Sequence, residues 1–540
     1  MGGYQMKIEK ILIEDQMAPI GLDEKKPAFS WLLTAEEGEQ NLMQSACRIV
    51  VRTGEDTVWD SGKMETGVST GIGYEGEALQ PCTKYEVKAE VWDNHGGKAE
   101  AESSFETGLM DSLYAAWEGA EWIGAPHATV CAENRGVFTI ESEFRMEGGK
   151  GEAGIVFGAN DFRLNDHTKN ELGMEGENYI RYAVCLEDGD ARLEIYRVGY
   201  APEDTAEKPF AVTKLVNWKE KTQEILTPEN ADAFHKLTVE VDGNVAYAYV
   251  DGILVDAIEE HGFFGTKVSG RQLNPRGNND VLPYPRLNEI GFYAGKGTTG
   301  YFKNLTVRNV RKPSAEIVRE TPEGRLDEGK SIFADQIPVE NGYFKVEDSQ
   351  ITADPSHHSI PMLRSCISCQ KEKKLVSARL YITARGIYDC RINGQEITED
   401  LLRPGLTQYD HRMNYQTYDI TGLMKPGRNG IGVTLASGWW SEAQTFVVKN
   451  FNYFGDKESL LAKVVMKYED GSREVFGTNT EDWKYFGEGP YLFSSYFAGE
   501  QYDARRAEVY ETYSLPEFDD STWEKPVVVD TVMIEEFCTM

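Results

Sequence analysis

The chain has 540 residues, too many for one hydrophobic core, because cores stop growing near ~250 to 300 residues. With 40% hydrophobic and 27% charged residues it resembles a soluble globular protein, and no apolar run approaches the ~20 residues that cross a bilayer. Its net charge of -33 would repel nucleic acid, so the composition favours a neutral or weakly charged ligand and neither a nucleic acid nor a membrane partner.

The amino-terminal residues and the cysteines both bear on the cellular compartment. The opening MGGYQMKIEKILIEDQ carries scattered charges and lacks the apolar segment of a signal peptide. Eight cysteines are too few for a disulfide framework, and Cys47, Cys185 and Cys390 lie in strand-like apolar patterns where a thiol simply packs. We therefore expect a cytoplasmic protein.

Residues 6–110 alternate between apolar and polar positions in short runs such as CRIVVRTG and YEVKAEVWD, separated by turn residues. This pattern predicts a β-sandwich over residues 1–112. Trp31, Trp59, Tyr85 and Trp92 fall where the inward-facing aromatic side chains of such a sandwich would lie.

Residues 133 to about 310 alternate again, as in GVFTIESEFRM and EIGFYAG, and DGNVAYAYVDG contains Asp-Gly turns between strands. A second sandwich is predicted over residues 131–312, with the polar interval 256–288 as a mobile or functional loop. The polar stretch 313–335 reads as a linker. A further β region follows over residues 336–532, and helical periodicity is almost absent.

Several motifs in this last region occur in a recognisable order, and together they strongly resemble the amino-terminal jelly-roll domain of bacterial α-L-rhamnosidases, glycoside hydrolase family 78. They are the Asn-Gly turn at 393–394, PGLTQYD at 404–410, YQTYD at 415–419, GWW at 438–440 and GEQYDAR at 499–505. The resemblance implies a jelly roll at this end of the chain.

The first hundred residues resemble the fibronectin-type module that opens many of these enzymes, in PIGLD at 19–23, VWDSGK at 58–63 and FETGL at 105–109. AEWIGAP, within 113–130, resembles the first jelly-roll strand, and PMLRSC at 361–366 resembles the next. The intervening piece therefore looks like an insertion, similar to a concanavalin-like or laminin-G-like sandwich. The predicted fold class is all-β, with several β-sandwiches.

Glycoside hydrolysis generally needs two carboxyl groups flanking the bond, one to protonate the leaving oxygen and one to activate water. In the family these groups lie in an α-helical toroid that follows the β domains, and no matching segment occurs in this sequence. We therefore carry over no catalytic residue, and we expect residues 533–540 to begin a link to a catalytic domain, present in cis or in trans.

The remaining candidates are carbohydrate-binding groups, and each also has a structural interpretation. Trp439 and Trp440 follow a predicted strand, so at most one would pack inward while the other could stack on a sugar ring. The polar candidates could bind hydroxyl groups or simply fix turns and ion pairs; they are Tyr409 and Asp410, near His411, and Glu500, Asp503 and Arg505.

No metal site is predicted. Cys366 and Cys369 are spaced like half of a zinc site, but no second pair of cysteines or histidines lies at a suitable spacing. Calcium remains possible, since oxygen ligands are abundant and some related rhamnose-binding modules use it, although no calcium-binding loop can be placed.

The resemblance implies a carbohydrate-recognition and scaffold portion of an α-L-rhamnosidase, binding rhamnosides or plant glycans for a catalytic toroid. A free-standing lectin-like protein is the alternative, and a scaffold that binds nothing is a third possibility.

Overall fold

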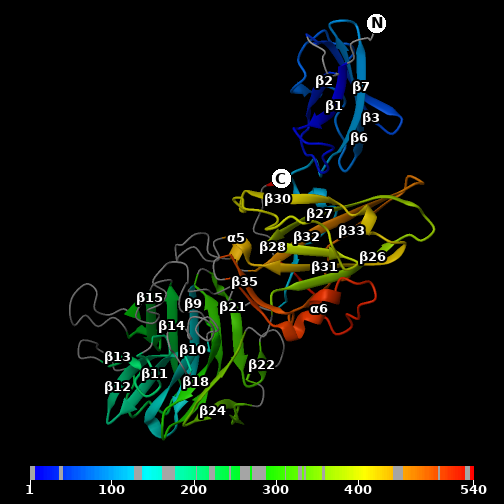
Figure 1. Cartoon of the computed structure of the whole chain (residues 1–540). Helices are drawn as coiled ribbons and strands as arrows, with labels where there is room; N and C mark the ends of the chain where they lie inside the picture. The colour runs from blue at the N-terminus through cyan, green and yellow to red at the C-terminus, as the bar shows by residue number, and fades with distance from the viewer. Residues whose placement is uncertain are drawn as a thin grey trace.

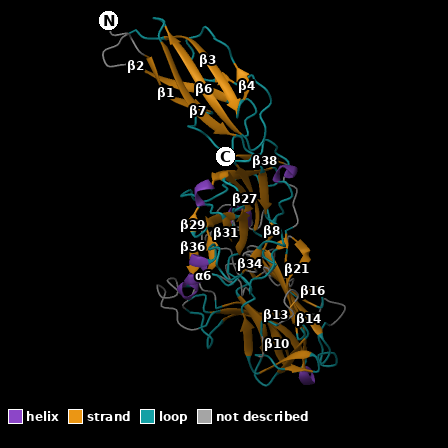
Figure 2. Cartoon of the chain, turned by 90° about the vertical axis from the view of Figure 1, so that its right-hand side faces the viewer, coloured by secondary structure: helices purple, strands orange, loops and turns teal. Residues whose placement is uncertain are grey.

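The computed structural model shows an all-β protein of several sandwiches, with only short helical turns in its described part. Both views show three bodies in a row, with the amino terminus at one end (Figures 1 and 2). No described helix has the length and apolar character to cross a membrane. The described residues are 6–35, 41–126, 137–160, 177–201, 203–217, 225–242, 245–255, 268–269, 287–310, 312–325, 331–333, 336–355, 359–441, 454–455, 457–496, 499–529 and 536–539.

The first body, here the first module, is a sandwich of two antiparallel sheets. One has the order β1-β2-β5, with β1 (Met6–Ile13), β2 (Ala28–Ala35) and β5 (Ile72–Gly73). The other has the order β4-β3-β6-β7, with β3 (Gln44–Thr53), β4 (Asp56–Asp60), β6 (Lys84–Asp93) and β7 (Lys98–Glu106). Alternate residues of β6 enter the core, as strand periodicity requires.

The predicted core aromatics of this module divide between two faces. Trp31 and Tyr85 are buried, and Trp59 packs against the same core. The prediction was wrong for Trp92, which directly follows the buried Val91 on β6 and so points to the opposite face. There the ammonium groups of Lys63 and Lys98 lie 5.1 and 5.4 Å from the centre of its ring.

The second body, the middle sandwich, also has two sheets. One has the order β29-β28-β31-β26-β34, with β26 (Met362–Cys369), β28 (Ile387–Ile392), β29 (Gln395–Glu396), β31 (Gly427–Ala436) and β34 (Lys484–Phe486). The other has the order β37-β8-β32-β27-β30-β38 with β33 beside β32, comprising β8 (Ile123–Gly124), β27 (Leu375–Arg385), β30 (Arg412–Asp419), β32 (Ser459–Tyr468), β33 (Arg473–Gly477), β37 (Val527–Val528) and β38 (Glu536–Thr539).

Short elements complete the middle sandwich. They are the hairpin of β35 (Tyr491–Ser495) and β36 (Gly499–Tyr502), the helices α5 (Gly438–Ser441) and α6 (Ala507–Thr512), and the 3-10 turns η1 (Tyr114–Trp117), η3 (Thr421–Leu423) and η4 (Ala504–Arg506). Residues 536–539 form β38, which pairs in parallel with β30. Phe537 of β38 is buried, with its ring 5.4 Å from that of Trp117.

The third body, the inserted sandwich, lies in sequence between β8 and β26. One sheet has the order β13-β12-β11-β10-β18-β25, with β10 (Gly151–Ala159), β11 (Tyr179–Glu187), β12 (Asp190–Val198), β13 (Phe210–Leu215), β18 (Glu289–Ala294) and β25 (Gln350–Ala353). The second contains β9 (Val137–Met146), β14 (His235–Asp242), β15 (Val245–Val250), β16 (Ile253–Leu254), β17 (Val268–Ser269), β19 (Thr299–Phe302), β20 (Leu305–Asn309), β21 (Lys312–Thr321), β22 (Gly324–Arg325), β23 (Val339–Glu340) and β24 (Tyr343–Glu347); the turn η2 spans Glu147–Gly149.

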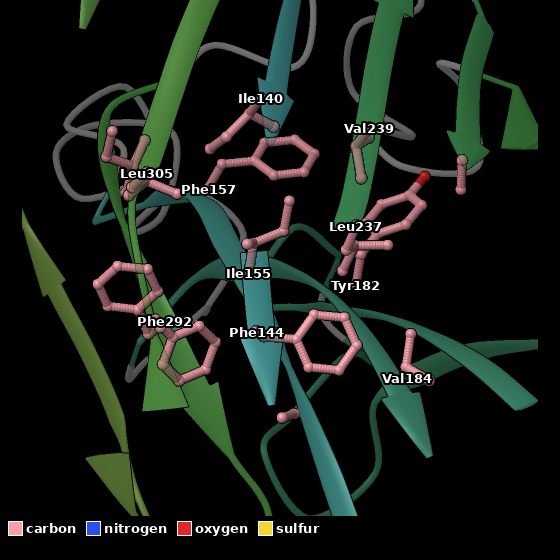
Figure 3. Packing of buried hydrophobic residues seen from close by; sticks show 14 of the residues in the cluster. Ile140, Phe144, Ile155, Phe157, Tyr182, Val184, Leu237, Val239, Phe292 and Leu305 are labelled. Atoms are coloured by element: carbon pink, nitrogen blue, oxygen red, sulfur yellow. The ribbon is translucent and has the colours of Figure 1, made fainter. Parts of the chain in front are cut away.

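Side chains from the two sheets of the inserted sandwich meet in one core. Figure 3 shows Ile140 of β9 and Phe157 of β10 close together, with Phe292 of β18 nearby. These side chains are fully buried. The predicted loop at 256–288 lies outside the described residues except for 268–269 and 287–288.

The linker predicted over 313–335 is wrong for its first part, because β21 pairs with β20 and β22 pairs with β21. Charged residues made this stretch look like a solvent-exposed linker, yet one of them is in the interior. Glu320 is buried, and its Oε2 accepts a hydrogen bond of 2.9 Å from the Ile332 amide. The jelly-roll boundary at 336 was also set too early, since β23, β24 and β25 belong to the sheets of the inserted sandwich.

Buried polar contacts join the first module to the middle sandwich. The Tyr415 hydroxyl on β30 donates to Asp23 Oδ2 at 2.7 Å and accepts from the Leu109 amide at 2.9 Å. Nearby, Arg379 of β27 donates two hydrogen bonds to the carboxylate of Glu106, at 2.6 and 2.5 Å. Burial raises the pKa of Tyr415, so its proton is retained and this orientation is fixed.

Removing the Tyr415 hydroxyl should loosen this junction. In Tyr415→Phe the buried Leu109 amide loses its acceptor, which costs about 1 to 2 kcal/mol locally. We expect hydrogen exchange at Leu109 to become roughly five- to thirtyfold faster. Tyr502→Phe, which removes a hydroxyl from an exposed ring, should leave this amide unchanged. An unchanged Leu109 rate in Tyr415→Phe would contradict the bridge.

A buried histidine joins β14 to the turn after β15. His235 Nδ1 lies 2.8 Å from Asp251 Oδ2, and Nε2 lies 2.9 Å from the Asn230 carbonyl oxygen. Both partners are acceptors, so the geometry suits an imidazolium that donates from both nitrogens. Burial lowers the pKa of His235, but the hydrogen bonds to Asp251 and Asn230 outweigh it, and the pKa is raised overall.

This raised pKa predicts a pH dependence of stability. The contribution is fully present below the unfolded pKa of about 6.5 and is lost as pH rises through the higher folded value. Thermal unfolding of the inserted sandwich should therefore move to lower temperature as pH rises from about 6.5. His235→Gln should abolish this dependence, whereas His411→Gln, at an exposed position, should retain it. A wild-type midpoint that is constant or rises over this range would refute the imidazolium.

Candidate functional site

A cavity of about 510 Å³ opens on the outer face of the β28–β31 sheet of the middle sandwich. Strand alternation explains its walls: Tyr388, Cys390 and Ile392 of β28 fill the core, so Asp389 and Arg391 face outward. Helix α5, strand β35 and the loop after β29 complete it, and Figure 1 shows α5, β28, β31 and β35 in the middle body. We refer to this cavity as the pocket.

Helix α6 and the residue after it pack on the same outer face. An ideal Cβ on Gly432 of β31 would lie 2.5 Å from Cε2 of Tyr513, so only glycine leaves room for that ring. The Tyr513 hydroxyl is 3.0 Å from Thr434 Oγ1. This packing brings Tyr510 of α6 to the pocket wall.

Asp389 is the centre of the polar wall. Its Oδ2 accepts from the Tyr510 hydroxyl at 2.9 Å, and its Oδ1 accepts from Arg403 Nη2 at 3.3 Å. The Arg391 guanidinium lies 4.5 Å from the centre of the Tyr510 ring. Burial raises the pKa of Tyr510, which therefore remains a hydrogen-bond donor.

The loop at 398–406 forms another wall and is fixed by contacts with its surroundings. The Arg403 carbonyl accepts from the Tyr388 amide at 3.1 Å, and the Pro404 carbonyl accepts from Gln416 Nε2 at 3.0 Å. Arg403 itself is buried, with its guanidinium 5.1 Å from the centre of the Tyr388 ring. The peptide bond between Arg403 and Pro404 is cis.

Three tyrosines line the side formed by β35, namely Tyr491, Tyr496 and Tyr510, and further rings pack against them. Tyr491 contacts Tyr502 and Tyr510 edge-on, with ring centres 4.9 and 5.2 Å apart. Tyr496 lies against Trp439, with ring centres 4.8 Å apart. Burial raises the pKa of Tyr496 to about 12, so its hydroxyl is protonated near neutral pH. These rings supply apolar surface and hydroxyl groups together.

The described lining is acidic overall, which restricts the class of ligand. Five carboxylates face two guanidinium groups; they belong to Asp389, Glu396, Glu399, Asp400 and Glu500, and to Arg391 and Arg403. Because the arginines already lie near Asp389 and Glu396, the remaining carboxylates can accept hydrogen bonds from a ligand. The lining suits a neutral molecule rich in hydroxyl groups and opposes an anion.

Glu500 is the predicted site residue that lines the pocket. It lies on β36, and its Oε1 accepts from Ser494 Oγ at 3.1 Å. Trp439 is half-buried and reaches the pocket through Tyr496. The two tryptophans were expected at the end of a strand, but they lie in helix α5.

Trp440 and Tyr409 lie together in a buried cluster behind the pocket. Trp440 is 3% exposed, and its Nε1 donates to the Lys457 carbonyl at 3.1 Å. Tyr409 is 2% exposed and donates to the Gly405 carbonyl at 2.7 Å. Their ring centres are 5.9 Å apart, so both side chains pack the interior and offer no free ring face.

The remaining predicted residues lie outside the pocket lining. Asp503 precedes η4 and accepts from the Arg505 amide at 3.1 Å and from its guanidinium at 2.8 Å. The Arg505 hydrogen bond holds the pKa of Asp503 at about 2. Asp410 is exposed, 3.8 Å from His411 Nε2.

The described residues also bear on whether the chain could bind a metal ion. Among the described residues, no group of three or more histidine, cysteine, aspartate or glutamate side chains could hold a metal ion. Cys369 packs into the core of the middle sandwich, whereas Cys366, three positions earlier on β26, lies on the opposite face near Arg428. The two thiols therefore do not converge.

Most residues that line the pocket were not predicted from the sequence. Its walls come from segments near 360, 387–403, 434–438 and 491–510, which meet only in the fold. One signal was available: charged residues alternate with buried ones in IYDCRI, so Asp389 and Arg391 mark an outward polar face.

Family models match both ends of the chain. A model described as the α-L-rhamnosidase N-terminal domain matches residues 373–536, and one described as a Rha78A-like N-terminal immunoglobulin domain matches residues 8–111. The second model describes the first module as an immunoglobulin domain, where the sequence suggested a fibronectin-type module; both are antiparallel sandwiches.

Curated relatives carry the same description. The α-L-rhamnosidase of Streptomyces avermitilis is 27% identical over 535 residues, covering 96% of this chain and 44% of that protein. That of Alteromonas sp. (strain LOR) is 34% identical over 183 residues, covering 33% of this chain and 19% of that protein. The chain thus spans less than half the length of these relatives.

Solved structures share the fold. The S. avermitilis α-L-rhamnosidase complexed with L-rhamnose has a TM-score of 0.55 at 21% identity, covering 99% of this chain and 46% of that one. The native enzyme of Aspergillus terreus has a TM-score of 0.50 at 17% identity, covering 97% of this chain and 34% of that one. The two family models therefore identify residues 8–111 and 373–536 as amino-terminal domains of the bacterial α-L-rhamnosidase type, and the solved structures show the same fold.

Proposed function

We propose that this chain is the carbohydrate-recognition and supporting portion of an α-L-rhamnosidase, and that its pocket binds a rhamnoside. The observation that carries the proposal is the lining of the pocket, where carboxylates and tyrosines stand beside aliphatic side chains. Carboxylates accept hydrogen bonds from sugar hydroxyls, and aromatic rings pack against the apolar side of a sugar ring. Ligand sites typically have a small number of polar groups that converge on a preformed cavity.

The size and charge of the pocket agree with such a ligand. A cavity of about 510 Å³ falls within the roughly 300 to 1,000 Å³ of small-molecule sites. A rhamnoside is neutral, so it meets no repulsion from the acidic lining or from the net charge of -33.

The supporting role forms the second part of the proposal. The partner would be a catalytic toroid, joined in cis or in trans, for which the sandwiches provide a rigid platform. The buried bridge at Tyr415 and the Arg379–Glu106 pair support this role, since they fix the first module on the middle sandwich. The inserted sandwich, with its concanavalin-like strand pattern, would add further glycan-binding surface. Release of rhamnose from an aryl rhamnoside by the purified chain would contradict a purely recognising and supporting role.

Glu500 should contribute directly to binding. A hydrogen bond to a charged acceptor contributes about 1.5 to 3 kcal/mol, so Glu500→Ala should weaken binding of methyl α-L-rhamnoside roughly 10- to 100-fold by calorimetry. Glu508→Ala removes an exposed carboxylate of α6 that does not line the described pocket, and it should bind as wild type does.

The outcomes separate the candidate functions. Equal binding by the wild type and Glu500→Ala would move the sugar site away from the pocket. Absence of binding by the wild type to any rhamnoside or plant glycan would leave only a scaffold. A free-standing lectin would bind equally well, but it would show no affinity for a rhamnosidase catalytic domain supplied in trans.

A further inference from the structure

Leu401 and Leu402, at the mouth of the pocket, are large apolar side chains that are exposed to solvent. Leu401 is 82% exposed and Leu402 is 58% exposed, and both line the pocket. Leu402 also has a φ of 59°, a left-handed conformation that side chains other than Asn, Asp and Gly seldom adopt. A strained backbone that presents apolar side chains to water has no evident benefit for the fold, and such positions cluster at binding sites.

These leucines do not belong to a loose loop. Directly after them, Arg403 is buried, and its carbonyl accepts from the Tyr388 amide. The next carbonyl, of Pro404, is held by Gln416. Upstream, the Asp400 amide donates to Thr398 Oγ1 at 3.1 Å. The leucines are therefore preceded by a local turn and anchored to the sandwich directly after them, with their side chains facing solvent.

The leucines continue the surface of the pocket. Asp400 and Glu399, their neighbours in sequence, line it with polar oxygens, while Ile387 and Leu435 line it with aliphatic carbons. A ligand held by the carboxylates would pass the two leucines where it leaves the cavity. At this exit the side chains of Leu401 and Leu402 present an apolar, uncharged surface.

We propose that Leu401 and Leu402 form an apolar lip that binds the aglycone of a glycoside, so that the site selects sugars carrying an aryl or alkyl group. This inference rests on the proposed function, because the sugar must occupy the pocket for its aglycone to reach the lip. Free sugars and glycosides with small polar aglycones then bind through the pocket alone. The apolar group gains affinity by leaving water against the leucines.

The test compares two ligands that share one sugar, methyl α-L-rhamnoside and p-nitrophenyl α-L-rhamnoside, by calorimetry on the full chain. We expect the aryl glycoside to bind at least about tenfold more tightly. The double variant Leu401→Ser/Leu402→Asn should lose this preference, so that it binds the two glycosides with equal affinity.

The variant is chosen so that folding does not confuse the result. Asparagine adopts the left-handed region more readily than leucine, so Leu402→Asn should unfold at the same temperature as wild type or higher. The matched control is Leu406→Ser, in the same loop, because Leu406 is 55% exposed but is not among the described residues that line the pocket. This control should retain the aryl preference.

Each outcome has a distinct meaning. Equal affinity for the two glycosides in the wild type overturns the apolar lip, as does an aryl preference that survives in the double variant. Loss of the preference in Leu406→Ser also overturns it, since any exposed leucine would then suffice. In these cases the pocket still binds sugar and the proposed function stands. If neither glycoside binds, the proposed function itself fails.

Discussion

Strand β8 has only two residues, yet it joins β37 to β32 in one sheet of the middle sandwich. The connection to the inserted sandwich depends on this strand. Ile123 of β8 pairs with Leu460 of β32 on one side and with Val528 of β37 on the other. At the next residue, Gly124, an ideal Cβ would lie 2.6 Å from the Glu458 carbonyl oxygen, so a side chain would separate the strands. The chain then leaves for the inserted sandwich and returns at β26. The insertion is thus tethered at both ends to one core.

The same core also carries the first module and the pocket. Strand β30 presents Tyr415 to the first module, while Gln416, its next residue, holds the Pro404 carbonyl and accepts from the Tyr388 hydroxyl. Successive strand residues point to opposite faces. One short strand therefore positions a neighbouring module on one side and the loop at 398–406 on the other.

Periodicity predicted the architecture well, because strand alternation is a local property of the sequence. It placed strands in all three bodies and identified Trp31 and Tyr85 as core residues. It failed where local appearance and environment disagree. Glu320 looks like a linker residue but is buried on β21, and Trp92 looks like a core residue but faces outward under two lysines.

The candidate site was harder to predict, for a physical reason that particular residues illustrate. Glu500 was found because acidic residues in a polar motif attract attention, whereas Tyr388, Arg403 and Tyr510 have no sequence pattern that joins them. Trp440 was a candidate for stacking on a sugar ring, yet in helix α5 its ring is buried, whereas that of Trp439 is only half-buried. Sites assembled from distant segments depend on how sheets and loops meet, and single-sequence periodicity does not describe those meetings.

Rigidity is the property that connects the pocket to the core. The Tyr388 ring fills the interior, its hydroxyl reaches Gln416, and its amide holds the Arg403 carbonyl. The loop that carries Leu401 and Leu402 is therefore ordered by the folding of the sandwich itself. A preorganised site loses little conformational entropy when a ligand binds, so a modest number of contacts can give useful affinity. The strained backbone at Leu402 is tolerated because the buried contacts that follow it leave the loop no alternative course.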